Sequence, residues 1–174
     1  MNRTETPQSR RKKPQVEIRE MEIDDLSTVF HLGEKLFTAT RVPNLYRTWD
    51  EFEVVELFQG DSQYCLVAEA EGEIVGFALG TTISKTRSAW KYGYLVWLGV
   101  DPRYQRYSVG RKLFRQLKNL MVDEGVRILL VDTEADNHSA LSFFQQLGFG
   151  NPEEHIYLSL NLARRKRRGG DRQP

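Results

Sequence analysis

The sequence is poor in the residues that build disulfides and metal sites. Cys65 is the single cysteine, so no disulfide can form within the chain. Its position in the apolar run YCLVA predicts a buried thiol that behaves as a small hydrophobic side chain. The three histidines, His31, His138 and His155, are scattered, and no spacing of cysteine and histidine suits zinc. We therefore expect no metal cofactor, and a reducing compartment around the protein.

Long apolar runs are missing as well. No segment reaches the length of about 20 apolar residues that spans a bilayer, and the N-terminus lacks the apolar core of a secretion signal. The sequence predicts a soluble, cytoplasmic protein with no membrane partner. Its 174 residues, 40% of them hydrophobic, suffice for one domain built around a sheet and a few helices.

The net charge of +1 conceals two basic tails. Residues 1–14 hold five basic residues and one acid, and residues 163–174 hold six basic residues and one acid. The segment between them, 15–162, holds 14 basic residues and 22 acids, a net charge of −8. Because the tails offer few apolar side chains to bury, we expect them to be disordered extensions of a domain at 15–162. Binding of the tails to nucleic acid is the less favoured alternative.

Hydrophobic periodicity predicts a domain of mixed strands and helices. The expected strands are 15–20, 63–70, 73–82, 92–100, 127–133 and 154–161, and the expected helices are 24–37, 48–59, one ending near 123, and 138–147. Asp24 or Asp25 carries the capping signal of the first helix, and Thr48 with Glu51 that of the second. The nearly continuous apolar run at 127–133 indicates a strand buried on both faces. This order predicts an α/β fold, with helices packed on a mixed sheet.

The stretch QRYSVGRK, Gln105–Lys112, places a glycine and several cations where a helix begins. A helix start presents unpaired backbone N–H groups and the positive end of the helix dipole, which together favour an anion. Six cations and no acid lie between residues 103 and 118, within a domain that is net acidic. On charge alone, a solvated basic helix face and a cradle for a ligand with several phosphates explain this pattern equally well.

Two segments resemble the motifs of the GNAT superfamily, the Gcn5-related N-acetyltransferases. Val100-Asp101-Pro102 followed by Gln105–Gly110 is similar to the family's cofactor loop, Gln/Arg-x-x-Gly-x-Gly/Ala after a strand that ends Val-x-Pro. The segment Asn137–Phe149 is similar to the family's Asn-x-x-Ala-x-x-Phe-Tyr-x-x-x-Gly-Phe helix. Ser108 departs from the first motif, and a serine resists the positive φ that glycine accepts. The element order over about 15–162 fits too, and within the family the chain looks most like bacterial and archaeal protein N-terminal acetyltransferases.

The resemblance implies a central mixed, mostly antiparallel sheet of six to seven strands, flanked by about four helices. It implies acetyl-CoA as co-substrate and no metal, with the pantetheine arm between two splayed parallel strands, here 94–100 and 127–133. The residues implied along the cofactor are Leu98, Gly99 and Val100 at the pantetheine, Gln105, Arg106, Tyr107, Ser108, Val109 and Gly110 at the pyrophosphate, Arg111 and Lys112 at the helix start, and Asn137 and Phe144 beside the pantetheine and thiol.

Many family members carry a tyrosine as general acid in the second motif, but here that position is Phe144, which cannot donate a proton. For the base, the resemblance points to Tyr94, four residues before Leu98, and to Asp132, five residues before Asn137. The backbone N–H of Leu98 would stabilise the oxyanion. Alternatively, Tyr94 is a core aromatic and Asp132 ends its strand facing solvent. The further candidates are Glu134 as a reserve base, His138, which fits a helix start better than a base, and Tyr157, which either lines the amine site or packs across strands.

The first part of the domain is acidic, since residues 15–80 hold four basic residues and 14 acids. In the GNAT fold this part borders the acceptor site, so we expect a primary amine of a protein or peptide, at its N-terminus or a lysine. A small amine such as a polyamine is the alternative, and solubility alone also explains the charge. Phe144 and the basic tails favour a third possibility, a non-catalytic CoA-binding or nucleic-acid-tethered regulatory module. A monomer and a homodimer are both open.

Overall fold

In the computed structural model of the chain, the described residues are 14–37, 49–84, 90–150, 152–154 and 156. They form one five-stranded sheet in which the strands lie side by side in chain order. The strands are β1 (Val16–Glu20), β2 (Cys65–Ala70), β3 (Glu73–Ser84), β4 (Lys91–Val100) and β5 (Val126–Leu130). β1 to β4 pair antiparallel, and β4 and β5 pair parallel. The predicted mixed, mostly antiparallel sheet is confirmed.

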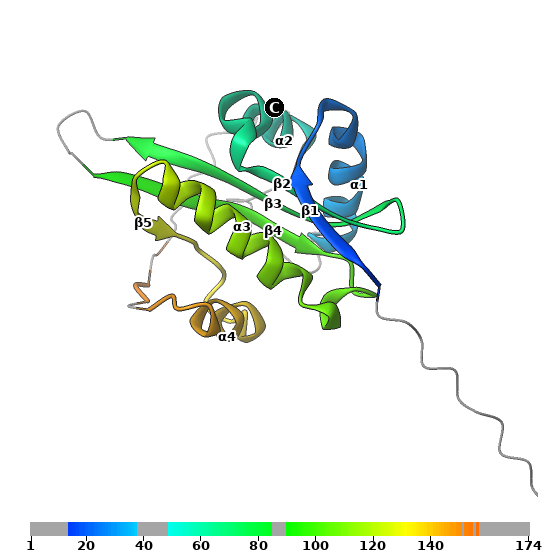
Figure 1. The fold of residues 1–174 in the computed structure, drawn as a ribbon. Coiled ribbons are helices and arrows are strands. Elements are labelled where there is room, and N and C mark those ends of the chain that lie inside the picture. The colour runs from blue at the N-terminus through cyan, green and yellow to red at the C-terminus, as the bar shows by residue number, and fades with distance from the viewer. Residues whose placement is uncertain (1–13, 38–48, 85–89, 151, 155, 157–174) are drawn as a thin grey trace, which may run out of the picture.

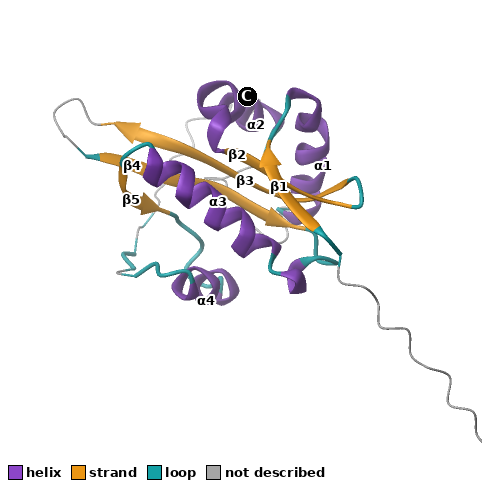
Figure 2. Ribbon diagram, viewed as in Figure 1, coloured by secondary structure: helices purple, strands orange, loops and turns teal. Residues whose placement is uncertain are grey.

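Helices cover both faces of this sheet (Figures 1 and 2). α1 (Leu26–Leu36) and α2 (Glu51–Asp61) pack on one face, which we call the α1/α2 face. α3 (Val109–Asp123) packs on the other, the α3 face, and α4 (His138–Gln146) lies beside it. Successive strand residues point to opposite faces, so the strands supply both cores: Phe77 and Trp97 are buried with α1 and α2, and Ala78 and Leu95 with α3.

The order of elements follows the prediction from β1 through α4. The turn between β2 and β3 uses Glu71 and Gly72, both with positive φ (55° and 82°), which suits a tight hairpin. Gly148, with φ of 99°, ends α4 as the sequence predicts. No helix in the described part of the chain is both long and apolar enough to cross a membrane.

One prediction about the strands needs correction, and another lies mostly outside the described residues. The sheet has five strands within the described residues; most of the strand expected at 154–161 lies outside them, and Glu154 and Ile156 are not in a strand. The run 127–133 is not a strand buried on both faces, because β5 ends at Leu130 and Ile128 and Leu130 remain 37% and 42% exposed. Apolar composition indicated a strand there but not how many of its faces are covered.

The helix starts also differ from prediction. Asp25 stands at the start of α1, but its carboxylate accepts bonds from the Glu22 backbone N–H (2.8 Å) and, at both oxygens, from Arg19 (2.6 and 3.0 Å) rather than capping α1. α2 begins at Glu51, and its cap is Asp50, which accepts from the Glu53 backbone N–H at 2.9 Å. The predicted cap Thr48 lies outside the described residues, and the helix begins two residues after the position that Thr48 would cap.

Candidate active site

β4 and β5 run together only at one end. Their parallel pairing covers Lys91–Tyr94 of β4 against Val126–Leu130 of β5, although β4 continues to Val100. β5 ends at Leu130, which pairs with Tyr94, so β4 continues past the end of β5 in the region where the resemblance implies a splay between 94–100 and 127–133. Within the described residues, no strand pairs with the second half of β4 on that edge.

A bulge in β4 assigns its side chains to the two faces. Leu79 of β3 pairs with Trp97, but the next residue, Gly80, pairs with Leu95, so Val96 is an extra residue in the strand. An extra residue reverses the alternation of side chains, a frequent device beside functional sites. Before the bulge Tyr94 lies on the α1/α2 face, opposite Thr81, whose hydroxyl bonds Asp61 of α2 at 2.5 Å. After the bulge Leu98 and Val100 pack with the α3 core.

The structure brings the two predicted base residues together. The phenol of Tyr94 donates a hydrogen bond to Oδ1 of Asp132, which lies just past the end of β5. Tyr94 is half-buried and Asp132 exposed, so solvent or an acceptor can reach the pair. The alternative of a purely core tyrosine does not fit this contact. Glu134, half-buried, follows two residues on, and His138 is the exposed first residue of α4, as its helix-start interpretation predicts.

The predicted phosphate cradle forms a short 3-10 turn, Gln105–Tyr107, that leads directly into α3. Ser108, between them, adopts φ of 59° and ψ of 26°, the left-handed region that favours glycine. The position therefore does require positive φ, and serine occupies it at a cost of about 1–2 kcal/mol relative to an unstrained residue. The first helical bond runs from the Lys112 N–H to the Ser108 carbonyl at 3.1 Å, so the N–H groups of Val109, Gly110 and Arg111 precede the helix ladder.

The cations around this turn do not all face the same way. Arg103 is held by the Asp101 carboxylate (2.9 Å), and this guanidinium keeps the pKa of Asp101 below its ordinary value. Lys112 donates to the Val16 carbonyl of β1 at 3.1 Å, so its ammonium is directed away from the turn. Arg106 is exposed at the turn itself. Lys112 was predicted to face the phosphates at the helix start, but its ammonium bonds the β1 backbone instead.

α4 lies against the start of α3. A Cβ added at Gly110 would come within 3.3 Å of the Phe143 ring, and the Arg111 guanidinium donates to Oε1 of Gln146 at 2.5 Å. Asn137 caps α4 by accepting from the Ala140 N–H at 3.1 Å. The sequence did not predict the contacts of Phe143 and Gln146 with α3. The second motif contains the pair Phe143-Phe144, but the sequence does not indicate which of the two rings packs against α3.

Phe144 occupies the position of the family's tyrosine, and in this structure its ring packs against neighbouring aromatic rings. Its ring lies edge-on to Phe143 and to Phe149 (centroids 5.4 and 5.5 Å away), and Phe149 in turn lies 5.5 Å from Phe114 of α3. This aromatic row attaches α4 to the α3 core. The other predicted residues Leu98 and Val100 are half-buried on the α3 face, and Gly99 is buried beside Leu36 and Phe77.

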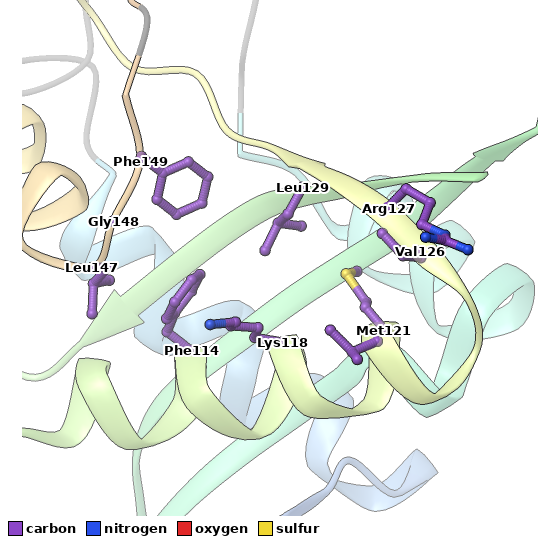
Figure 3. A pocket seen from close by; sticks show the side chains of 10 residues that line it. Phe114, Lys118, Met121, Val126, Arg127, Leu129, Leu147, Gly148 and Phe149 are labelled. Atoms are coloured by element: carbon purple, nitrogen blue, oxygen red, sulfur yellow. The ribbon is translucent and has the colours of Figure 1, made fainter. Parts of the chain in front are cut away.

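A pocket of about 240 Å³ opens on the α3 face at the far end of α3 (Figure 3). Apolar side chains of α3, β5 and the segment after α4 line it, among them Met121, Leu129 and Phe149, and Lys118 and Arg127 supply its only charges among the described residues. It is separate from the Tyr94 hydroxyl, because Tyr94 points to the opposite face of the sheet. In the described part of the chain, no group of three or more His, Cys, Asp or Glu residues could hold a metal ion.

The fold and the site define the class of protein. The model of the "Acetyltransferase (GNAT) family" matches residues 26–149, which include both motifs, the Tyr94–Asp132 pair and α3. The chain belongs to this family.

Curated proteins named N-alpha-acetyltransferase 30 are similar to part of the chain. Human N-alpha-acetyltransferase 30 is 31% identical over 99 residues, which cover 57% of this chain and 27% of that protein, and the Xenopus laevis protein of the same name is 31% identical over 99 residues, 36% of its length. The matched segment thus spans about a third or less of these relatives.

Solved structures share the fold at lower identity. Ard1 from Thermoplasma volcanium superposes with a TM-score of 0.67 at 21% identity, covering 79% of this chain and 84% of that chain. The aminoglycoside N-acetyltransferase AAC(6')-Iy in complex with CoA superposes with a TM-score of 0.68 at 21% identity, covering 86% and 97%. At such identities the structures establish the fold alone.

Proposed function

We propose that the protein transfers an acetyl group from acetyl-CoA to a primary amine of a protein or peptide, at an N-terminus or a lysine. The observation that carries the proposal is the hydrogen bond between Tyr94 and Asp132, which lies where β5 ends beside β4. A tyrosine and a carboxylate joined in this way, half-buried and open to an acceptor, form a route for removing a proton from an attacking amine.

The start of α3 fits the phosphate end of CoA. The N–H groups of Val109, Gly110 and Arg111 precede the helix ladder, and the fifteen-residue helix directs the positive end of its dipole toward them. Arg106 and Arg111 are exposed there, and no acid lies between residues 103 and 118. The pantetheine arm would then follow β4 past Leu98 and Gly99, toward the bulge.

The bulge supports an approach of the two reactants from opposite sides of the sheet. Leu98 and Val100 belong to the α3 face, from which the thioester would arrive, while Tyr94 belongs to the α1/α2 face, from which the amine would arrive. The amine nitrogen attacks the thioester carbonyl as its proton passes to the Tyr94 oxygen, and the Tyr94 hydroxyl proton passes to Asp132. The C–S bond of the resulting tetrahedral intermediate then breaks, which leaves the acetylated amine and a CoA thiolate. The N–H of Leu98 is the proposed donor to the oxyanion.

No side-chain acid is assigned to the leaving thiolate. Phe144 holds the family's tyrosine position and has no proton to donate, and its ring packs against Phe149. A thiolate is a weaker base than an alkoxide, since thiols ionise near pH 8.5, so protonation from solvent suffices. The proposal therefore predicts that activity does not depend on an acid at position 144.

The acceptor class rests on the relatives and on charge. The relatives named N-alpha-acetyltransferase 30 support a polypeptide acceptor. The described acids of residues 49–61, Asp50, Glu51, Glu53, Glu56 and Asp61, lie on the α2 side, where a cationic acceptor would approach. The similarity to AAC(6')-Iy supports the alternative of a small amine acceptor.

One assay tests the proposal. The purified protein is mixed with acetyl-CoA and either peptides with free N-termini, peptides with an internal lysine and a blocked N-terminus, spermidine or an aminoglycoside, and thiol release is followed with mass spectrometry of the product. Acetylated peptide with no acetylated spermidine or aminoglycoside is the expected result. Acetylation of a small amine alone would replace the proposal by its alternative, and thiol release with no acceptor modified would refute both.

A further inference from the structure

β3 and β4 extend beyond the rest of the sheet as a hairpin. β2 pairs with β3 only as far as Leu79, whereas β3 continues to Ser84 and pairs with β4 back to Lys91. The two strands project past the helices in Figure 1. α2 reaches the base of this projection through Asp61, whose carboxylate accepts from the Thr81 hydroxyl at 2.5 Å.

One face of the projecting hairpin is apolar and aromatic. Thr81 pairs with Tyr94 and Ile83 with Tyr92, so the side chains of these four residues share the α1/α2 face. Ile83 is 41% exposed, and Trp90, directly before β4, is 53% exposed. We call the surface of Ile83, Trp90 and Tyr92 the hairpin face.

The hairpin face is continuous with the proposed acceptor site. Tyr92 stands two residues from Tyr94 on the same side of the same strand, a step of about 7 Å. Trp90 comes two residues before Tyr92, directly ahead of β4, and is 53% exposed. Cationic Lys91 points to the opposite side, where it lies 3.7 Å from Glu124 after α3. The carboxylates of Asp61 and Asp132 lie at the inner end. A ligand along this surface therefore meets carboxylates first and apolar side chains next.

We propose that the hairpin face binds the polypeptide that carries the acceptor amine, two to four residues away from that amine. This inference rests on the proposed function, because it takes the amine to lie at Tyr94 and Asp132. An extended chain covers about 3.3–3.6 Å per residue, so a side chain two to four residues from the amine reaches Tyr92 or Trp90. An apolar or aromatic side chain there removes exposed Ile83 and Trp90 surface from water. A small amine has no atoms that reach so far.

The test compares acceptors of two lengths. The test uses three acceptors: a ten-residue peptide with leucine or tryptophan at its third and fourth positions, the same peptide with serine at both, and a dipeptide amide with the same first two residues. Each acceptor is assayed with the wild-type protein and with Ile83→Ala, Trp90→Ala and the double variant. Ser84→Ala, on the other side of the hairpin, and Val122→Ala, an exposed apolar side chain of α3 that is 57% exposed, are the matched controls.

The double variant is expected to lose about tenfold in kcat/KM for the apolar ten-residue peptide, equivalent to about 1.4 kcal/mol, mostly through KM. For the dipeptide amide and the serine peptide, kcat/KM should change less than twofold. The two control variants should act on all three acceptors with nearly the wild-type kcat/KM. An equal loss on long and short acceptors, or no loss on either, overturns the inference while leaving the proposed function intact. A double variant that shifts the sedimentation of the protein without changing peptide kinetics would assign the surface to self-association instead. If the wild-type protein acetylates none of these acceptors, the proposed function fails, and this inference fails with it.

Discussion

The phenol of Tyr94 and the carboxylate of Asp132 are joined by a hydrogen bond although the residues stand 38 positions apart in the chain. The contact depends on two features of the sheet. The parallel pairing of β4 with β5 brings the ends of the two strands together, and the bulge at Val96 places Tyr94 on the face away from α3. The hydrogen-bonded pair thus lies at the point where β5 ends and β4 continues.

The first prediction concerns this pair. Asp132→Asn and Tyr94→Phe should each lower kcat by about 100-fold or more at neutral pH, the usual contribution of a general base, with little change in CoA affinity. Glu134→Gln, two residues from Asp132, is the matched control and should stay near wild type. Steady-state kinetics and calorimetry with CoA measure both quantities. A pH–rate profile unaltered in Asp132→Asn would remove Asp132 as the base, and a loss confined to Glu134→Gln would move that role there.

A second prediction concerns the phosphate end of the site. Gly110→Asp should weaken CoA binding by more than tenfold, because it adds a negative charge and bulk beside the N–H groups at the start of α3. Gly110→Ala separates bulk from charge: its Cβ meets the Phe143 ring at 3.3 Å, which a small shift of that ring accommodates, so CoA affinity should change little. Gly60→Asp, in open space on α2, is the control for added charge. Equal affinity of the wild type and Gly110→Asp by calorimetry would refute the cradle.

The third prediction uses the left-handed backbone of Ser108 (φ 59°). Ser108→Gly removes strain of about 1–2 kcal/mol but adds unfolded-state entropy that costs about 0.5–1 kcal/mol, so a gain in stability of up to about 1.5 kcal/mol is expected. Ser108→Val, β-branched, should lose stability at the same position. Ser142→Gly, within α4, is the opposite control and should lose about 0.5 kcal/mol, the difference in helix propensity between serine and glycine. Urea unfolding measures all three; a gain for Ser108→Val would contradict the strain.

A fourth prediction concerns pH. Bonds from Arg19 hold the pKa of Asp25 below its ordinary value of 3.8. A carboxylate whose pKa is depressed by folding stabilises the fold fully above its unfolded pKa, and this contribution is lost as the pH falls through the folded pKa. Asp25→Asn should therefore cost about 1.5–3 kcal/mol at neutral pH and much less well below pH 4. Exposed Asp24→Asn is the control, and a cost independent of pH would show that the charge of Asp25 is not the cause.

The fifth prediction concerns Cys65, which is fully buried on β2. Burial, with a smaller contribution from Asp61, raises the pKa of the thiol to about 12. Because the thiolate is the reactive form, Cys65 should resist alkylation in the native protein at mildly alkaline pH and react at once in concentrated guanidinium chloride. Mass spectrometry after a timed pulse of iodoacetamide distinguishes the two. Rapid labelling of the native protein would mean that β2 opens readily.

Sequence reasoning worked where local chemistry decides. The turn at Glu71-Gly72 and the end of α4 at Gly148 follow from residues whose backbone preferences act over a few positions. It failed where packing decides: Thr48 was predicted as the cap of α2, but Asp50 serves, and the apolar composition of 127–133 did not reveal that Ile128 and Leu130 stay partly exposed.

The sequence by itself determined the order of elements, the buried cysteine and the two motifs that identified the family, because periodicity, glycine positions and motif spacing are properties of the chain. The tertiary structure decided which residues meet. The bulge at Val96 turns Tyr94 to one face and Leu98 to the other, Lys112 bonds Val16 instead of facing the turn, and Phe143 rather than Phe144 rests against Gly110. A one-residue shift in register moves every following side chain to the opposite face, and only the pairing of strands far apart in the chain fixes that shift.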